Sequence, residues 1–527
     1  MTVTALVGLL ACAIGGIMSV TADPATTGIT LFHTFFSVAF FVVTLVGPAL
    51  AANSVASERE GRTWEAVILT GLSPKLIARG KFLSAFTSIS LYIVMLAPVG
   101  ALPFLFGGVT ALEVVVAFVF LLLFALLSVA FGLAISSALA SGRTAIVLTL
   151  LLAFPITLTA YLGLGLGLSF AAHEAWPGVL GGPPVWLPTA YERAPFSLEY
   201  VTFLVLIPIA SVALPAWFFY EITVANLTSP TEDRATGLKR WFAVMTPLVT
   251  GAATIPVATI PTSEPHVGFA IAASIVFVFL TFCIFVFHGD AIGPSRRVLV
   301  HWERTRAGWV TRFFGPGVMK TMTLQLVMGA SGLLLIGATG VAVAWLSPHV
   351  PATDRVGEVE RIAWFVEYAA TYFVFMVGFA AWVRTKASTP GIARVMLLVA
   401  IFVTAAGPWI VAAIAGIISE GGPEALAVAA PSPFFAFVLL KAVSGAIRGP
   451  AMAAGAVCSF AWTMIGLGLL VSAGSRSKEI IRRHHAMLAE ADAMLAREDE
   501  EAIVPADQHG DEQGTAEPSA GAAPGGA

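Results

Sequence analysis

Long apolar stretches separated by short polar segments recur along the whole chain. Twelve of them have about the 20 residues that a helix needs to cross a bilayer core. They cover residues 3–20, 29–52, 84–106, 112–139, 144–170, 199–220, 241–260, 267–287, 321–346, 361–383, 395–418 and 451–472. This pattern predicts an all-α polytopic membrane protein of about 12 transmembrane helices.

Two apolar segments need a separate interpretation. Residues 3–20 lack a basic flank, which favours a true span over a cleavable signal peptide. Residues 431–450 are short and interrupted by Pro and Gly, which favours a re-entrant or interfacial element on the outer side.

The order of spans and loops predicts two six-helix halves, 1–228 and 241–474, joined by a cytoplasmic linker at 229–240. Each half has a long basic loop between its second and third spans, at 53–82 and 289–320. This indicates a parallel repeat, although any chain of twelve spans can be divided to look symmetrical. A cytoplasmic tail, 475–527, follows as an amphipathic helix. From about residue 503 its composition predicts disorder.

The loop at 53–82 alternates charged, apolar and turn residues at short range. Its apolar positions, from Trp64 to Leu69, predict a short helix, and Gly71 suits the end of that helix. Ser73 followed by Pro74 is typical of an N-cap and a first helical position. We therefore expect two short helical segments with a corner between them.

Composition supports the membrane assignment and excludes a soluble domain. The chain is 58% hydrophobic and 11% charged, with a mean hydropathy of +0.89, whereas soluble domains have about 25% charged residues. The three cysteines, Cys12, Cys283 and Cys458, lie in apolar stretches without metal-ligand spacing, and we interpret them as buried thiols.

Charge distribution predicts the orientation. Five of the 28 Lys and Arg lie on one predicted side, namely Arg193, Arg355, Arg361, Lys441 and Arg448, and the others lie on the side of loop 53–82. The positive-inside rule then makes that loop and both termini cytoplasmic, in a plasma (inner) membrane.

Candidate chemistry is sparse. Residues 78–82 contain Gly-Lys, but a nucleotide-binding loop would need Gly at Lys75 and a hydroxyl at Phe82. No catalytic signature occurs, and we expect no catalytic residue, metal, cofactor or nucleic-acid partner. His484 and His485 suit a solvated basic helix better than a metal site.

Glu367 and His33 are the ionisable residues deepest in the spans, and Glu367 is the candidate residue of a transport path. Both lie near predicted outer ends, which favours interfacial side chains over a path.

The sequence of loop 53–82 closely resembles the signature of type-2 ABC exporter permeases. The matching residues are Glu58, Arg59, Gly61, Thr63, Glu65, Thr70, Leu72, Ser73, Gly80 and Lys81. The resemblance covers roughly residues 29–139. It implies that the loop is a coupling helix that docks on a separate cytoplasmic ATPase, with coupling residues Glu58, Arg59, Gly61, Thr63, Glu65, Thr70, Ser73 and Lys81.

Two features depart from that family. Its members usually have a basic amphipathic helix before the first span, and this sequence starts almost directly with an apolar stretch. The loop at 289–320 also lacks the Gly-x-Thr-x-Glu pattern, which puts its docking in doubt.

The resemblance implies a non-enzymatic permease subunit of an ATP-driven exporter, with ATP hydrolysed on a partner chain. One chain would act as a pseudo-dimer, and a homodimer stays open. An ion-gradient transporter or channel and a polytopic enzyme acting on lipid are the alternatives. The spans contain no charge cluster or aromatic cage that would identify the substrate.

Overall fold

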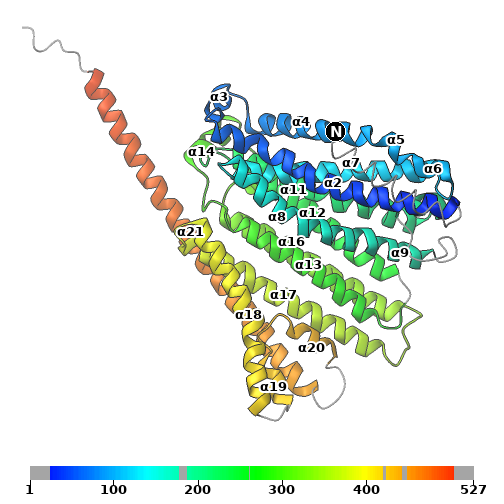
Figure 1. The fold of residues 1–527 in the computed structure, drawn as a ribbon. Helices are drawn as coiled ribbons and strands as arrows, with labels where there is room; N and C mark the ends of the chain where they lie inside the picture. The colour runs from blue at the N-terminus through cyan, green and yellow to red at the C-terminus, as the bar shows by residue number, and fades with distance from the viewer. Residues whose placement is uncertain (1–23, 177–186, 260–261, 419–422, 442–447, 504–527) are drawn as a thin grey trace, which may run out of the picture.

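The computed structural model describes residues 24–176, 187–259, 262–418, 423–441 and 448–503 (Figure 1). Throughout these ranges the secondary structure is helical and no strand occurs. The first predicted apolar stretch, the end of the tail beyond residue 503, and Cys12 lie outside the described residues.

The first part of the chain forms helices that correspond to its predicted spans and loops. They are α2 (Pro24–Glu60), α3 (Trp64–Leu69), α4 (Pro74–Met95), α5 (Ala97–Gly100), α6 (Leu102–Phe106), α7 (Ala111–Ala138), α8 (Gly142–Ala160), the π-helix η1 (Tyr161–Leu166), α9 (Gly167–Ala175), α10 (Leu187–Arg193), the π-helix η2 (Tyr200–Leu206) and α11 (Ile207–Leu227).

The second part also consists of long and short helices. They are α12 (Thr236–Thr259), α13 (Pro265–Phe287), α14 (Arg296–Arg304), α15 (Trp309–Phe314), α16 (Val318–Leu346), α17 (Arg355–Lys386), α18 (Pro390–Ile418), α19 (Pro423–Val428), α20 (Phe435–Lys441) and α21 (Arg448–Ile503).

The described residues contain ten helices that are long and apolar enough to cross a membrane. An eleventh span is present if α4 and the segment Ala97–Phe106, which meet at a bend of 46°, cross as one unit. These helices coincide with the predicted spans after the first. The all-α polytopic membrane fold is therefore confirmed, and the total of 12 is not tested.

Each part is built around one central helix. α7 packs against α2, α4, α10 and α11, while α17 packs against α13, α16, α20 and α21. Glycines allow close approach, because a Cβ at Gly132 of α7 would lie 2.1 Å from the Pro48 carbonyl oxygen. A Cβ at Gly378 of α17 would lie equally close to the Gly466 carbonyl oxygen. α11 contacts both α7 and α12 and joins the two parts.

The predicted linker is shorter than expected and the last helix is longer. α12 begins at Thr236, because Asp233 Oδ1 accepts hydrogen bonds from the backbone N–H groups of Ala235 and Thr236. Residues 236–240, which the sequence placed in the linker, therefore belong to a helix. α21 runs without interruption from its membrane segment into the predicted tail helix and extends beyond the bundle (Figure 1).

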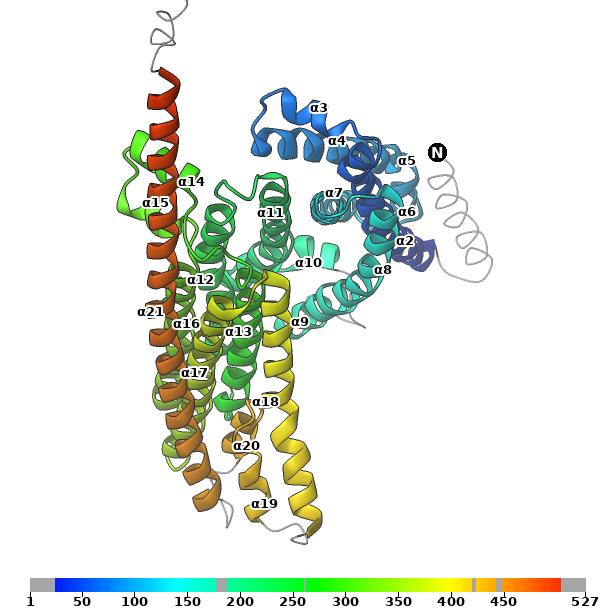
Figure 2. The same cartoon turned by 90° about the vertical axis from the view of Figure 1, so that its left-hand side faces the viewer.

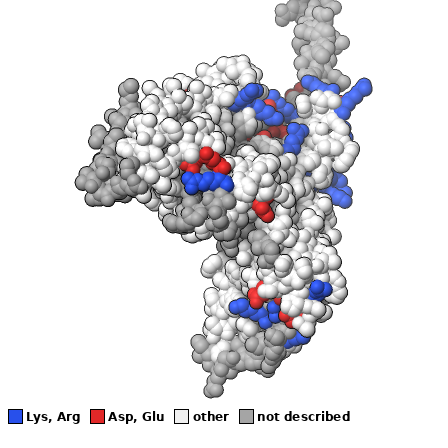
Figure 3. Space-filling view, turned by 90° about the vertical axis from the view of Figure 1, so that its right-hand side faces the viewer, with Lys and Arg blue, Asp and Glu red and all other residues white. Residues whose placement is uncertain are grey.

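Both basic loops lie at one end of the bundle. Figures 1 and 2 place α3, the pair α14 and α15, and the C-terminal part of α21 at this common end. Seen from the right-hand side of Figure 1, charged side chains form small groups of mixed sign on a largely uncharged surface (Figure 3).

Candidate functional site

The candidate site is the loop that carries α3, and its entrance is a tight turn at the end of α2. The Thr63 N–H donates to the Glu58 carbonyl oxygen at 2.9 Å, and the Arg62 N–H donates to Arg59 O at 3.2 Å. These two bonds close the helix, and Arg62 takes the left-handed conformation with φ 57°. For a residue other than Gly this conformation costs about 1–2 kcal/mol, so the surrounding contacts must hold it.

Polar contacts fix the base of this loop to the bundle. Lys81 Nζ lies 2.6 Å from Glu58 Oε1 and donates to Ser54 O at 3.0 Å, joining α4 to α2. Arg59 Nη1 donates to Ser137 O at 2.8 Å, and its guanidinium lies 5.5 Å from the Trp64 ring centre. Glu58, Arg59 and Lys81, which the sequence marked as coupling residues, thus hold the loop in place from within.

A further contact at this base was missed by sequence reasoning. Glu60 Oε2 accepts a hydrogen bond from the Gly142 N–H at 2.8 Å and so caps the first turn of α8. The partners are separated by 82 residues, and no local pattern indicates that they meet.

Three more predicted coupling residues shape the chain locally. The Thr63 hydroxyl donates to Glu58 O at 3.2 Å, and the Thr70 hydroxyl donates to Val67 O at 2.6 Å. Ser73 Oγ accepts from the Leu76 N–H at 3.4 Å and caps α4, as its sequence predicts. Gly61 lies at the helix end, where its N–H donates to Ser57 O.

The outward face of α3 combines apolar side chains with one carboxylate. No residue of α3 is buried, and the exposed fractions of Ile68 and Leu69 are 56% and 84%. Glu65 is exposed in the first turn, and no ion pair or hydrogen bond holds its carboxylate within the described part of the chain. Leu72 and Leu76 extend the exposed apolar surface into α4. This is the type of surface that a partner protein covers.

The second loop, 289–320, contains a turn with a left-handed Arg, as the first loop does at Arg62. Arg306 has φ 46°, its N–H donates to Glu303 O at 3.2 Å, and the Ala307 N–H donates to Trp302 O at 2.9 Å. Trp309 of α15 is 78% exposed. The sequence does not signal this likeness, because no Gly-x-Thr-x-Glu pattern is present.

The loop containing α14 is also contacted by the last helix. Arg296 Nη1 lies 2.5 Å from Asp492 Oδ1 of α21. Segments 291–295 and 480–485 line a common groove of about 250 Å³. α14 is therefore partly covered by its own chain, in contrast to α3. His484 and His485 line this groove.

A buried ion pair holds the base of the second loop. Lys239 is fully buried, and its Nζ lies 3.1 Å from Asp290 Oδ2 and donates to Gly315 O at 2.6 Å. Asp290 Oδ2 also accepts the Thr321 hydroxyl at 2.5 Å. Arg384 Nε of α17 donates to Asp290 O. The pair ties the start of α12 to α16 and α17. No local pattern indicates it, and the sequence analysis placed Lys239 in the cytoplasmic linker.

His288, directly after α13, is also buried in this region. Burial lowers the pKa of its imidazole to about 4, and the charges of Arg384 and Arg394 contribute to the lowering. The ring is therefore neutral at physiological pH.

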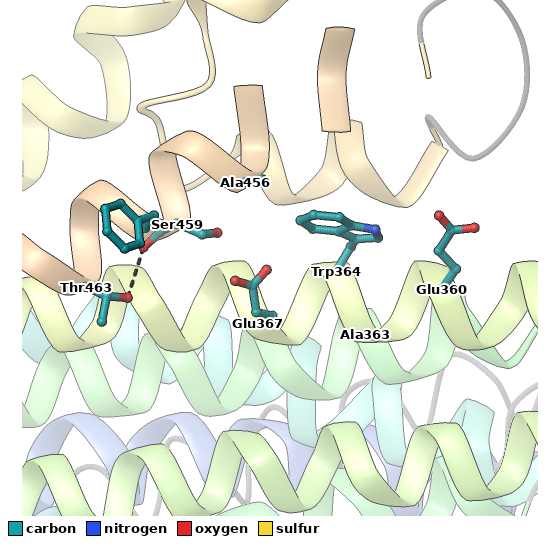
Figure 4. A pocket seen from close by; sticks show the side chains of 8 residues that line it. Glu360, Ala363, Trp364, Glu367, Ala456, Ser459 and Thr463 are labelled. Carbon is teal, nitrogen blue, oxygen red and sulfur yellow. Dashed lines mark hydrogen bonds between the residues drawn. The ribbon is translucent and has the colours of Figure 1, made fainter. Parts of the chain in front are cut away.

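Glu367, the candidate path residue, lies far from α3 on α17. It lines a groove of about 460 Å³ between α17 and α21 (Figure 4). α17 begins at Arg355, so Glu367 lies 12 residues after the start of its helix, compared with 6 after the start of the predicted span of 361–383. His33 lies on α2, and the structure does not bring it to this groove.

The described residues contain no group of three or more His, Cys, Asp or Glu side chains that could hold a metal ion. Cys283 is a buried thiol, as predicted, and Cys458 is a half-buried one.

Comparison with known proteins gives one match. Residues 3–188 match the family model described as ABC-2 family transporter protein, and this region contains α2 to α9 and the loop with α3. No curated protein matches the chain, and no solved structure does. The resemblance that was inferred from ten residues of one loop is thus supported by a match that extends over several spans. Residues 3–188, about a third of the chain, are therefore similar to the ABC-2 family of transporter membrane proteins.

Proposed function

We propose that this protein is the permease subunit of an ATP-binding-cassette exporter and that α3 docks on a separate cytoplasmic ATPase. The observation that carries the proposal is the exposed face of Glu65, Ile68 and Leu69 on a helix whose base is fixed. An apolar patch beside a free carboxylate suits a partner that offers an apolar pocket and a basic residue.

The fixed base makes α3 suitable for transmitting motion. Arg59 links the loop to the end of α7, and Glu60 links it to the start of α8, so a displacement of α3 acts on three spans at once. ATP would be hydrolysed on the partner, and the permease would convert the movement of that partner into a change among its spans. In this proposal both termini and loop 53–82 are cytoplasmic in a plasma (inner) membrane.

The second loop provides another possible docking surface, but less of it is exposed than of the loop with α3. α15 exposes Trp309 and Val310, whereas α21 covers part of α14. We infer that one chain acts as an asymmetric pseudo-dimer, in which the loop with α3 supplies most of the coupling.

Copurification tests the proposal. The tagged full chain, extracted from its native membranes, should bring down a P-loop ATPase in a fixed ratio, and the complex should hydrolyse ATP. Leu69→Asp should abolish recovery of the ATPase because it places a charge in the apolar contact. Val356→Asp, at another exposed apolar position, in the first turn of α17 and outside the loop with α3, should leave recovery unchanged.

The alternative classes give a different result. An ion-gradient transporter, a channel or a lipid-modifying enzyme would be purified without an ATPase, and Leu69→Asp would not change its composition. Either finding would contradict the proposed function.

A further inference from the structure

The groove between α17 and α21 contains a carboxylate that forms no ion pair with any of the residues that the structure describes. Glu360, Trp364 and Glu367 follow one another along one face of α17, at spacings of four and three residues (Figure 4). Ser459, Phe460 and Thr463 of α21 form the opposite wall.

The two acids of this groove have different environments. Glu360 accepts hydrogen bonds from Arg448 Nη2 at both carboxylate oxygens, at 3.0 and 2.9 Å. Within the described residues no Lys, Arg or His forms an ion pair with Glu367. The negative charge of Glu360 is thus balanced by the chain itself, and that of Glu367 is not.

The depth of Glu367 makes an unbalanced charge costly. It lies 6 residues after Arg361 and 17 before Arg384, the nearest basic residues on either side of it in α17. At 1.5 Å per residue these distances are about 9 and 26 Å, which places Glu367 within the apolar part of α17, nearer the end with Arg361. A carboxylate at such a depth is stabilised by a counter-charge or by protonation.

A second polar group is available in the same groove. Ser459 is 2% exposed, and its hydroxyl interacts with the Glu367 carboxylate. The Thr463 hydroxyl donates to the Ser459 carbonyl oxygen at 2.9 Å, so it does not occupy the Ser459 hydroxyl. An ammonium group can therefore contact the Glu367 carboxylate and the oxygen of the Ser459 hydroxyl together.

We propose that this groove binds an amphipathic amine, that is, a primary ammonium group attached to an apolar chain. The ammonium lies between the Glu367 carboxylate and the Ser459 hydroxyl, and the apolar chain lies along Trp364 and Phe460. An indole next to a carboxylate favours an organic cation over a metal ion, because the ring attracts the cation and covers its apolar part. A volume of about 460 Å³ suits a small organic ligand.

The test uses the purified full chain in nanodiscs of phosphatidylcholine, without any ATPase, and measures equilibrium binding of labelled dodecylamine. Saturable binding is expected. Glu367→Gln should weaken it about tenfold or more, because a charge-assisted hydrogen bond is lost inside the membrane. Ser459→Ala should weaken it less. Glu264→Gln, which removes an exposed acid before α13, should bind as the unmodified chain does.

Two further measurements keep the result interpretable. Glu367→Asp retains the charge and should recover part of the binding, and thermal unfolding should show that each variant is folded. Dodecyltrimethylammonium, which cannot donate to Ser459, should bind more weakly than dodecylamine. Replacing phosphatidylcholine by phosphatidylethanolamine should displace the amine if an aminolipid is the natural source, and displacement will be absent if a free amine is.

Binding that is not saturable, or that is equal in Glu367→Gln and in the unmodified chain, would overturn the proposal and leave Glu367 a protonated acid. Because no ATPase is present, this outcome is independent of whether α3 docks on one.

Discussion

Lys81 Nζ and Glu58 Oε1 lie 2.6 Å apart and join the first turns of α4 to the end of α2. Both side chains are largely shielded from solvent, and α3 lies between the two joined segments. The ion pair therefore closes the loop at its base, so that α3 is presented as a rigid element.

Lys81→Met should loosen α3 and reduce ATPase stimulation in the reconstituted complex. It leaves Glu58 without its cation, and an unsatisfied, partly buried acceptor costs about 1–3 kcal/mol. Lys75→Met, an exposed lysine on the same helix, is the control and should have no effect. Unchanged stimulation in Lys81→Met would mean that docking does not depend on a fixed loop.

Glu65→Ala should strongly lower ATPase stimulation. The exposed Glu65 carboxylate is held by no contact within the described part of the chain, so its removal affects the contact with the ATPase and not the fold. Glu303→Ala, at an exposed position of the second loop, should lower it much less. Stimulation is measured in reconstituted vesicles at equal protein content. Equal effects of the two changes would indicate a symmetric pseudo-dimer.

Thr63→Ala tests a different contribution from the same loop. The Thr63 hydroxyl donates to Glu58 O and so supports the turn that orients α3. We therefore expect Thr63→Ala to lower ATPase stimulation less than Glu65→Ala does. The effect should add little to that of Lys81→Met, because both changes loosen one structural unit. Full additivity would assign Thr63 to the partner contact.

Lys239→Met should destabilise the protein by about 3–5 kcal/mol, since breaking a buried pair leaves the Asp290 carboxylate without the cation that contacts it. Arg240, the next residue in the chain, is exposed and provides the matched control. Arg240→Met should leave the stability of the protein nearly unchanged. Thermal unfolding of the detergent-solubilised variants measures the difference. Similar midpoints would contradict the structural role of the pair.

Acidification should destabilise the protein through His288. Its pKa is about 4 in the folded chain and about 6.5 in the unfolded one, so the unfolded chain binds more protons between these values. The stability that the neutral ring contributes is present above about pH 6.5 and is lost as pH falls toward 4. His288→Phe should reduce the drop in unfolding temperature between pH 7 and pH 5. An unchanged drop would assign the acid sensitivity to other groups.

Cysteine labelling tests the orientation. In a background without Cys12, Cys283 and Cys458, Val356→Cys should react with an impermeant reagent added outside intact cells. Leu69→Cys should react only after the membrane is opened. Both positions are strongly exposed, so accessibility depends on the side of the membrane. Reaction of Leu69→Cys in intact cells would reverse the proposed topology.

Much of the fold could be read from local patterns. Apolar stretches located the described spans because a bilayer imposes a minimum helix length that any sequence must satisfy. Ser73 and Pro74 gave the start of α4, and Gly71, with φ 71°, gave the turn before it. These features depend on neighbours in sequence, which is why sequence alone was sufficient.

Roles within the candidate site depended on contacts between distant segments. A ten-residue signature located the coupling loop, yet only the fold separated Glu58, Arg59 and Lys81, which hold α3, from Glu65, which remains free. The partner of Arg59 is 78 residues away, and that of Glu60 is 82 residues away. Spacing along the chain does not reveal such pairs.

The sequence by itself determined that the chain spans a membrane many times and that the loop at 53–82 forms two helical segments with a turn between them. Both features depend on the length of apolar stretches and on turn residues, which act locally. Tertiary structure decided which charges are balanced. Lys239 was placed in a cytoplasmic linker and is buried against Asp290, whereas Glu367 faces a groove in which the described residues supply no cation for it. The physical reason is that the energy of a charge depends on its depth and on its neighbours in space, and both are fixed only when the helices pack.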